Sequence, residues 1–328
     1  MTRRTFLWSL AATVAVAAAL ITWVGDGGGT FRLSDIPNGE TGAAPSGRGF
    51  PKSFTDYHGF ELTLGKPPAR IASQALATDS LLFAAVPPER IVAVSMYATE
   101  PQYSNIVEIV RRYNIPSIRD AEYAIRLDPD LLLISNISRA DFTDLVRQGG
   151  IPTYSMSTVF SSLDEISAGL RTIGELTGEP EAAATAIAEL EAAIEAAVSK
   201  RPAATQHSPP RVLALSGFSY SSGKGSLFED IVEVLGAINV GSEQGLGAWG
   251  KVGSEQIAGW NPDWIVSGTG GAERSDVLRK LLADPAIATT TAGRKAQVLV
   301  VEDHYYLTMS QHVVHLVNAI AEALYGAK

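Results

Sequence analysis

One short pattern occurs twice in the chain, and it limits the possible folds more than any other feature. The first copy reads AEYAIRLDPDLLLIS, from Ala121 to Ser135, and the second reads SEQIAGWNPDWIVSG, from Ser254 to Gly268. In both copies a Glu stands seven residues before a Pro-Asp pair, an apolar run follows, and the copies are 133 positions apart. A short apolar run bounded by Pro and polar residues predicts a buried strand. The pattern therefore predicts two similar lobes, each with the same strand preceded by a helix.

Apolar runs and helical segments alternate around each copy. An alternation of strands and helices is typical of a mostly parallel sheet that is covered by helices on both faces, so the predicted fold class is α/β. The predicted strands are Ile91–Ser95, Leu131–Ser135, Ile151–Ser155, Arg211–Ser216, Trp264–Ser267 and Gln297–Val301.

A helical connection separates the two alternating regions. Ser162 and Glu165 have the spacing of a capping box, and Gly178 ends the helix that they open. Pro180 suits the first turn of a second, Ala-rich helix of about 20 residues, which would be about 30 Å long. We expect this helix to cross between the lobes. The predicted divisions are a first lobe at 50–161, the connection at 162–200 and a second lobe at 201–328.

The N-terminus has the features of an export signal. MTRRTFLW is followed by an uncharged apolar run from Phe6 to Val24, and Arg3-Arg4 resembles the twin-arginine signal. Residues 1–24 are either removed, with Ala15–Ala17 as a small-residue cleavage site, or kept as a membrane anchor. Residues 25–49 are rich in Gly and predict a flexible linker. The folded part is therefore expected to be periplasmic or otherwise extracytoplasmic.

Composition excludes several classes of function. The chain has no Cys, which rules out disulfides, thiolate metal sites, a Cys nucleophile and a lipid-modified Cys. A net charge of −9 argues against a nucleic-acid-binding protein.

Motifs for catalysis or nucleotide binding are incomplete. SSGKGS, at 221–226, lacks the first Gly of a phosphate-binding loop and has Gly225 after its Lys, so a turn before a helix is the better interpretation. GFSYSSG does not fit the nucleophile-elbow pattern. His312 and His315 share a helix face and could bind a metal, but partly exposed helix histidines are the usual case.

Aromatic residues are the more informative group. Tyr97 and Tyr220 follow predicted strands, Trp249 precedes a helix, and Tyr305 and Tyr306 follow the last strand. Ligands of parallel sheets bind at loops that follow strands, so these side chains are candidate ligand contacts.

The full series of motifs resembles the class III periplasmic solute-binding proteins of ABC importers, which carry cobalamin, ferric siderophores or haem. It comprises PPARIAS, RIVAVS, PDLLLIS, SSGKGSLFEDIVEVLGAINV, VGSEQIAGWNPDWIVSG and AGRKAQVLVVED, in that order, across about 50–326. The resemblance implies two Rossmann-like lobes joined by one long rigid helix, with the ligand cleft between them. It places Tyr97, Tyr220 and Trp249 at aromatic cleft positions and Asp303, His304, Tyr305 and Tyr306 in a cleft loop.

The resemblance also implies partners. The ligand would be a metal chelate, the protein would be a monomer without a cofactor or metal of its own, and it would deliver the chelate to an importer permease with its ATPase. Glu122 and Glu255, one in each copy of the repeated pattern, would pair with Arg residues of that permease. Asp120 and Ser254 are the expected N-caps of their helices.

The first lobe departs from the cobalamin binders. It has Pro116 and Ser135 where they have further aromatics, and it adds Arg111, Arg112 and Arg119, which favours an anionic ferric siderophore. A Tyr ligand to ferric haem is a further alternative. Two other classes of function stay open: a chelatase-like enzyme that uses His304 or His315, and an anchored sensor or scaffold.

Overall fold

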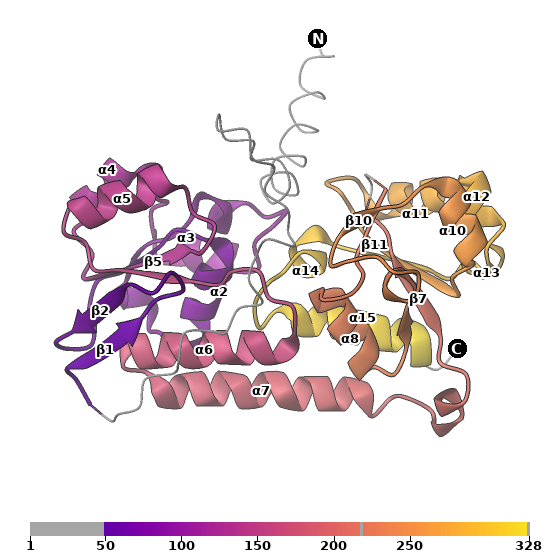
Figure 1. Ribbon diagram of the computed structural model, residues 1–328, viewed down its shortest axis with the longest axis horizontal. Helices are drawn as coiled ribbons and strands as arrows, with labels where there is room; N and C mark the ends of the chain where they lie inside the picture. Colours follow the sequence, from indigo (N-terminus) through magenta and orange to yellow (C-terminus); the bar gives the residue numbers. More distant parts are fainter. Residues whose placement is uncertain (1–48, 217–218, 327–328) are drawn as a thin grey trace, which may run out of the picture.

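The computed structural model describes residues 49–216 and 219–326, and Figure 1 shows them as two lobes side by side above a pair of long helices. The expected export signal and most of the expected linker lie outside the described residues. Within the described ranges, none of the helices has the length and apolarity that crossing a membrane requires.

The first lobe is built on a four-stranded parallel sheet with the strand order β4-β3-β5-β6. One face is covered by α2 and α6, and α4 and α5 cover the other. In β5, Leu131 and Leu133 point to the first face while Leu132 and Ile134 point to the second, as the two-residue period of a strand requires. The elements are β3 (Ile71–Ser73), α2 (Leu76–Ala85), η2 (Pro88–Arg90), β4 (Ile91–Ala93), η3 (Met96–Thr99), α3 (Val107–Arg112), α4 (Ala121–Arg126), β5 (Leu131–Ser135), α5 (Ala140–Gln148) and β6 (Thr153–Met156).

The second lobe repeats this topology. Its parallel sheet has the order β9-β7-β11-β12, so in both lobes the first strand lies between the second and the third, and the fourth is at the edge. The elements are β7 (Arg211–Ala214), β8 (Tyr220–Ser221), α8 (Leu227–Val234), β9 (Ile238–Asn239), α9 (Val240–Glu243), β10 (Gly250–Lys251), α10 (Ser254–Trp260), β11 (Trp264–Gly268), α11 (Arg274–Ala283), α12 (Pro285–Ala288), α13 (Thr291–Arg294), β12 (Val298–Val301), α14 (Asp303–Tyr306) and α15 (Val313–Tyr325). The predicted α/β class with mostly parallel sheets is confirmed.

The Asp of each repeated Pro-Asp pair ties the third strand of its lobe to the first. The carboxylate of Asp130 accepts a hydrogen bond from the backbone N–H of Arg70 at 2.8 Å, and that of Asp263 accepts one from Arg211 at 3.0 Å. Both Asp backbones also donate to the carbonyl of the same Arg, at 2.9 Å in each lobe. This shared arrangement gives the Asp a structural reason to recur.

The two Arg side chains, of Arg70 and Arg211, also bind the C-terminal ends of α4 and α10, the helices that precede the third strands. Arg70 donates from Nε to the carbonyl of Asp128 at 3.1 Å, and Arg211 donates from Nη1 to that of Asn261 at 2.9 Å. Asp128 and Asn261 both adopt the left-handed conformation, with φ of 48° and 46°, which turns the chain into the Pro. A cation at the carboxyl end of a helix is also favoured by the helix dipole.

The helices of the repeated pattern start at equivalent positions, with one correction to the predicted caps. Asp120 caps α4 as expected, since its Oδ1 accepts from the N–H of Tyr123 at 2.6 Å. The prediction that Ser254 caps α10 is wrong. Gly253 is the N-cap, and Ser254 already has helical backbone as the first residue of the helix. The N–H of Gly253 is satisfied by Oε1 of Gln256 at 2.8 Å.

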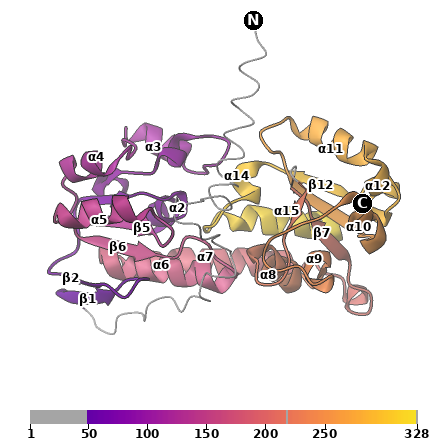
Figure 2. The same cartoon turned by 45° about the horizontal axis from the view of Figure 1, so that its top comes forward.

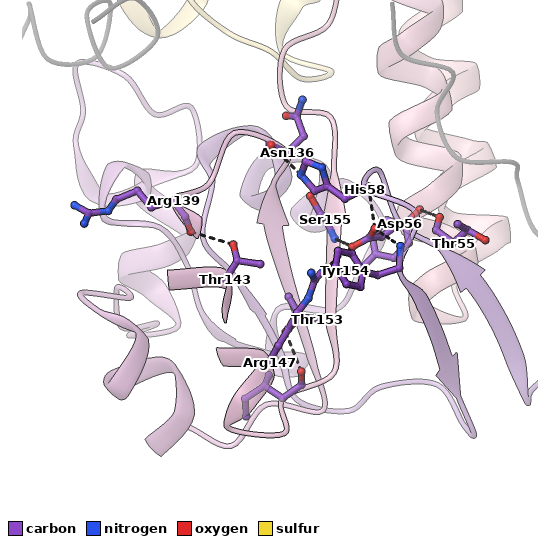
Figure 3. A network of polar contacts seen from close by, with 12 residues as sticks. Thr55, Asp56, His58, Asn136, Arg139, Thr143, Arg147, Thr153, Tyr154 and Ser155 are labelled. Carbon is purple, nitrogen blue, oxygen red and sulfur yellow. Dashed lines mark hydrogen bonds and ion pairs between the residues drawn. The ribbon is translucent and has the colours of Figure 1, made fainter. Parts of the chain in front are cut away.

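A hairpin of β1 (Lys52–Thr55) and β2 (Glu61–Leu64) packs beside the first sheet. Figure 3 shows the buried carboxylate of Asp56 at the centre of the polar contacts that fix this turn. It accepts from the N–H groups of His58 and Phe60, both at 2.9 Å, and from the guanidinium of Arg147 at 2.7 Å. The side chain of His58 in turn contacts the carbonyl of Asn136 at 3.0 Å.

The lobes are connected by α6 (Leu163–Thr177) and α7 (Pro180–Val198), which lie along one side of the molecule (Figures 1 and 2). The predicted start of α6 at Ser162 is confirmed by the bond from the N–H of Glu165 to its hydroxyl at 3.2 Å. A Cβ on Gly174 would come within 2.5 Å of the Cβ of Ala183, so small residues let the two helices pack closely. One hydrophobic cluster runs from α2 through α6 and α7 to α15. The connection is therefore part of a core that both lobes share.

The predicted strands do not include β3 or β9, which have three and two residues. The predicted domain boundaries stay a prediction.

Candidate functional site

Both sheets present the loops that follow their strands toward the middle of the molecule, where α14 lies (Figure 1). In the second lobe α14 begins two residues after β12 and carries all four residues of the expected cleft loop. His304 and Tyr305 line a pocket of about 210 Å³ that faces α3 of the first lobe. The opposite wall is formed by Pro101, Ser104, Asn105, Val107, Glu108 and Arg111. The structure thus places a polar pocket between the two lobes.

Asp303 differs from its neighbours because its carboxylate is already fully engaged. The residue is 3% exposed, and its two oxygens accept from the N–H groups of Gly270 and Gly271 at 2.9 Å each. Gly268, at the end of β11, leaves room for this seating, since a Cβ there would be 2.7 Å from Oδ1 of Asp303. Burial raises the pKa of the neighbouring Tyr306 phenol, and the charge of Asp303 adds to that rise. Asp303 and Tyr306 therefore hold α14 in place, whereas His304 and Tyr305 face the pocket.

Tyr97 lies in η3, which begins three residues after the end of β4, as the sequence predicted for a loop that follows a strand. Its ring meets that of Tyr103 edge to face, with centroids 6.3 Å apart. Met96 beside it is 60% exposed, which is the highest value among the exposed large apolar side chains of the described residues. Sequence reasoning missed Met96, although its position directly after the predicted strand is the same signal that singled out Tyr97.

Tyr220 and Trp249 form a stacked pair in the second lobe. The short strands β8 and β10 pair antiparallel and bring the two rings to a centroid distance of 5.9 Å at an angle of 14°. The indole Nε1 of Trp249 is buried and finds no hydrogen-bond partner among residues 49–216 and 219–326. A buried N–H donor of this kind is costly to leave unpaired.

The three histidines near α14 form a chain of ring contacts. The ring centroid of Tyr305 lies 4.1 Å from that of His304 and 4.4 Å from that of His315. The rings of His315 and His312 are stacked, with centroids 6.2 Å apart. Burial lowers the pKa of His312 to about 4, helped by the nearby His315 and His304. The described part of the chain contains no group of three or more His, Cys, Asp or Glu side chains that could hold a metal ion.

The loop SSGKGS does not form an open phosphate site. Its Gly225 N–H donates to the carboxylate of Glu229, and Ser226 caps α8 by accepting from the N–H of Glu229 at 3.1 Å. The backbone N–H of Lys224 donates to the carbonyl of Leu246 at 2.9 Å. The chain's own groups thus occupy the start of α8, in agreement with the interpretation as a turn before a helix.

Glu122 and Glu255 occupy equivalent places, each as the second residue of its helix. Both side chains are exposed, and neither forms an ion pair with a cation of the described residues. Their helices lie on the side of the molecule opposite α7 (Figure 1). Both carboxylates are therefore available to an external partner.

Comparison with known proteins adds the following findings. A family model described as "Periplasmic binding protein" matches residues 71–305. The chain is 25% identical over 318 residues to a "Cobalamin-binding protein" of Halobacterium salinarum, covering 96% of this chain and 84% of that protein. It is 22% identical over 282 residues to the "Uncharacterized ABC transporter substrate-binding lipoprotein YvrC" of Bacillus subtilis, covering 84% of this chain and 86% of that protein. The structure resembles the periplasmic heme-binding protein RhuT from Roseiflexus sp. RS-1 in apo form, with a TM-score of 0.64 and 23% identity over 78% of this chain and 97% of that one.

Proposed function

The chain belongs to the periplasmic binding protein family, and we propose that it captures a metal chelate outside the cytoplasm and delivers it to the permease of an ABC importer. The observation that carries this proposal is the pocket between α3 and α14, which is lined from both lobes. A pocket lined from two lobes is a common place for a small-molecule ligand to bind. The proposal includes that the protein is a monomer, catalyses no reaction and binds no nucleic acid.

The side chains around the cleft suit a ligand with a wide conjugated face and polar edges. Tyr305 lines the pocket, and Tyr97 and the stacked Tyr220 and Trp249 are assigned to the cleft by their places near the ends of strands, since they are not among the pocket's lining residues. Arg111 and Glu108 both line the pocket wall and form an ion pair there at 3.1 Å. These features favour a ferric siderophore, a cobalamin or haem as the ligand class. The named relatives include a cobalamin-binding protein and a heme-binding protein.

The ligand can be identified from the exported protein itself. The protein purified from its native export route should carry a chromophore: a Soret band for haem, a corrin band for cobalamin, or a charge-transfer band for a catecholate siderophore. Mass spectrometry of the released ligand should agree with the band. Conversion of the chelate by the purified protein would instead indicate the chelatase-like enzyme.

The aromatic residues provide the test of the site. We expect Trp249→Ala and Tyr97→Ala each to weaken binding of that chelate by about 1 to 3 kcal/mol, the range typical of aromatic contacts at binding hot spots. Tyr123→Ala, on α4, is the control, because its ring packs over the guanidinium of Arg126 in the same helix and does not follow a strand. Unchanged affinity in both cleft variants would show that the ligand binds elsewhere.

A further inference from the structure

Two side chains of the first lobe reach across to α14 and hydrogen-bond with the second lobe. Gln102 donates from Nε2 to Oδ2 of Asp303 at 3.1 Å, and Asn105 donates from Nδ2 to the backbone carbonyl of His304. Both come from the segment that joins η3 to α3, so they belong to the same stretch of chain as Tyr97. We call these two hydrogen bonds the interlobe bridges.

The second-lobe end of the first bridge is rigid. Asp303 is buried and held by the N–H groups of Gly270 and Gly271, whose positive φ values of 58° and 75° aim both groups at the carboxylate. Gln102 therefore contacts an acceptor that cannot follow the first lobe if the lobes move apart. Because Gly271 still satisfies the same oxygen, loss of Gln102 would leave no buried carboxylate unpaired.

Gly271 lies in close contact with the first lobe. A Cβ at this position would lie 2.9 Å from Nε2 of Gln102, so the amide at the end of that side chain would have to shift. The chain thus has its smallest residue at the point where the two lobes touch. This observation is independent of the hydrogen bonds and points to the same contact.

The interlobe bridges lie at the pocket between α3 and α14. Asn105 and His304 line the pocket as well as forming a bridge, so the width of the pocket depends on that bridge. Its volume of about 210 Å³ is below the range of roughly 300 to 1,000 Å³ that small-molecule sites usually have. A chelate as large as a porphyrin or a corrinoid enters only if α3 and α14 separate, and that separation breaks both bridges.

We infer that Gln102 and Asn105 are specificity-determining residues, which set the separation of the lobes and thereby disfavour large chelates relative to small ones. This inference rests on the proposed function for the identity of the ligand, but the separation of the lobes can be measured without one. If the bridged form dominates, the apparent affinity for a large chelate is reduced by the small fraction of molecules with separated lobes. Removing a bridge increases that fraction.

The first experiment measures the distance between the lobes without ligand. Because the chain has no Cys, nitroxide labels can be attached at Arg112→Cys in α3 and Lys280→Cys in α11 without background labelling. Double electron–electron resonance should show a longer and broader distribution of label-to-label distances for the Gln102→Ala/Asn105→Ala variant than for the parent. Gln148→Ala, an exposed Gln on α5, is the matched control and should not change the distribution. Identical distributions in parent and double variant would overturn the inference.

A second experiment measures the same distance distribution after substitution of Gly271. Gly271→Ala should also widen the distribution in the parent, but it should add nothing in a Gln102→Ala background, because the side chain that it would meet is gone. Equal widening in both backgrounds would mean that residue 271 acts through local backbone strain and would contradict the close contact as the cause.

Binding is then measured with hemin and cyanocobalamin as probes. In the double variant, cyanocobalamin affinity should rise by about 3- to 10-fold relative to the parent, as expected for losing one or two net hydrogen bonds from the bridged form. Hemin, which is flat, should gain less. If the labels report separation but neither probe binds any variant, the bridges stand and the proposed ligand class fails. If the probes bind the parent and the double variant with equal affinities, the inference fails and the proposed function stands.

Discussion

Asp79 is the residue whose surroundings are least favourable for its ordinary charge. It lies in the first turn of α2 with no exposed surface, and only one of its oxygens is paired, with the N–H of Ser95 at 3.0 Å. Burial raises its pKa to about 7, and the neighbouring Ser73 and Ser95 only partly oppose that rise. Ser95 directly precedes η3, so Asp79 also supports the loop that carries Tyr97.

This pKa predicts how stability depends on pH. A carboxyl group whose pKa is higher in the folded state stabilises the fold below its unfolded pKa and loses that contribution as the pH rises through about 7. We expect Asp79→Asn to be more stable than the parent at pH 8 by about 2 to 4 kcal/mol, and the difference to vanish near pH 4. Urea unfolding followed by Trp fluorescence measures both values. The exposed Asp144→Asn on α5 is the control, and parallel curves for parent and Asp79→Asn would contradict the prediction.

The lowered pKa of His312 predicts that this residue changes stability with pH in the opposite direction to Asp79. Its pKa is lowered to about 4, so the neutral imidazole is favoured in the fold, and the contribution to stability is present above the unfolded pKa of about 6.5 and lost as the pH falls toward 4. We expect the stability of His312→Gln to fall less than that of the parent between pH 6.5 and 4, by about 1 to 3 kcal/mol. The exposed His207→Gln should follow the parent. A parent curve that is flat over this interval, once corrected for Asp79, would show that His312 titrates normally.

Among the helices and strands, the repeated helix–strand unit carries two acidic residues with different roles. In each lobe, the Asp of the Pro-Asp pair and the Arg at the start of the first strand connect three elements. These are the first strand, the third strand and the C-terminal end of the helix that precedes the third strand. The Glu seven residues earlier makes no such contact. The same repeated pattern therefore contains one acidic residue that the fold needs and one that the fold leaves free.

This difference can be measured within one helix and strand. We expect Asp263→Ala to destabilise the protein by about 1 to 3 kcal/mol, because the backbone N–H of Arg211 loses its charged acceptor. Asp130→Ala should have a similar effect in the first lobe. Glu255→Ala is the control and should change the free energy of unfolding by less than about 0.5 kcal/mol, as exposed substitutions usually do. Equal effects of Asp263→Ala and Glu255→Ala in thermal unfolding would refute the structural role of the Asp.

In the whole molecule, the shared core through α6 and α7 connects the two lobes that carry the free glutamates. Glu122 and Glu255 each stand at the same position of their helix, on the side opposite α7 (Figure 1). A partner with two cationic sites at matching separation would bind both at once. Exposed charge pairs of this kind act mainly on encounter and register.

We therefore expect Glu122→Arg and Glu255→Arg to leave folding and chelate binding unchanged while uptake falls, most strongly in the double variant. Uptake of radiolabelled chelate by cells with equal amounts of exported protein measures the effect. Glu181→Arg, in the first turn of α7 on the other side of the molecule, is the control for added positive charge. Normal uptake by the double variant would leave these residues with only their favourable place near the helix dipole.

Local patterns in the sequence were enough to predict the features that depend on neighbouring residues. The period of the apolar runs gave the α/β class, the offset of the repeated pattern gave two equivalent lobes, and Ser162, Gly178 and Pro180 gave the ends of the connecting helices. These signals are local because a strand, a cap or a helix start is decided by neighbours within a few residues.

Which side chains are free to act depends on contacts that form only in the folded protein. Asp303, His304, Tyr305 and Tyr306 are consecutive in the sequence, but only His304 and Tyr305 line the pocket, because Gly268, Gly270 and Gly271 hold Asp303 inside the second lobe. Gln102 and Asn105 carry no signal in the sequence, since their partners are about 200 residues away along the chain. Contacts between lobes depend on how two separately folded sheets pack against a common core, and no local pattern records that arrangement.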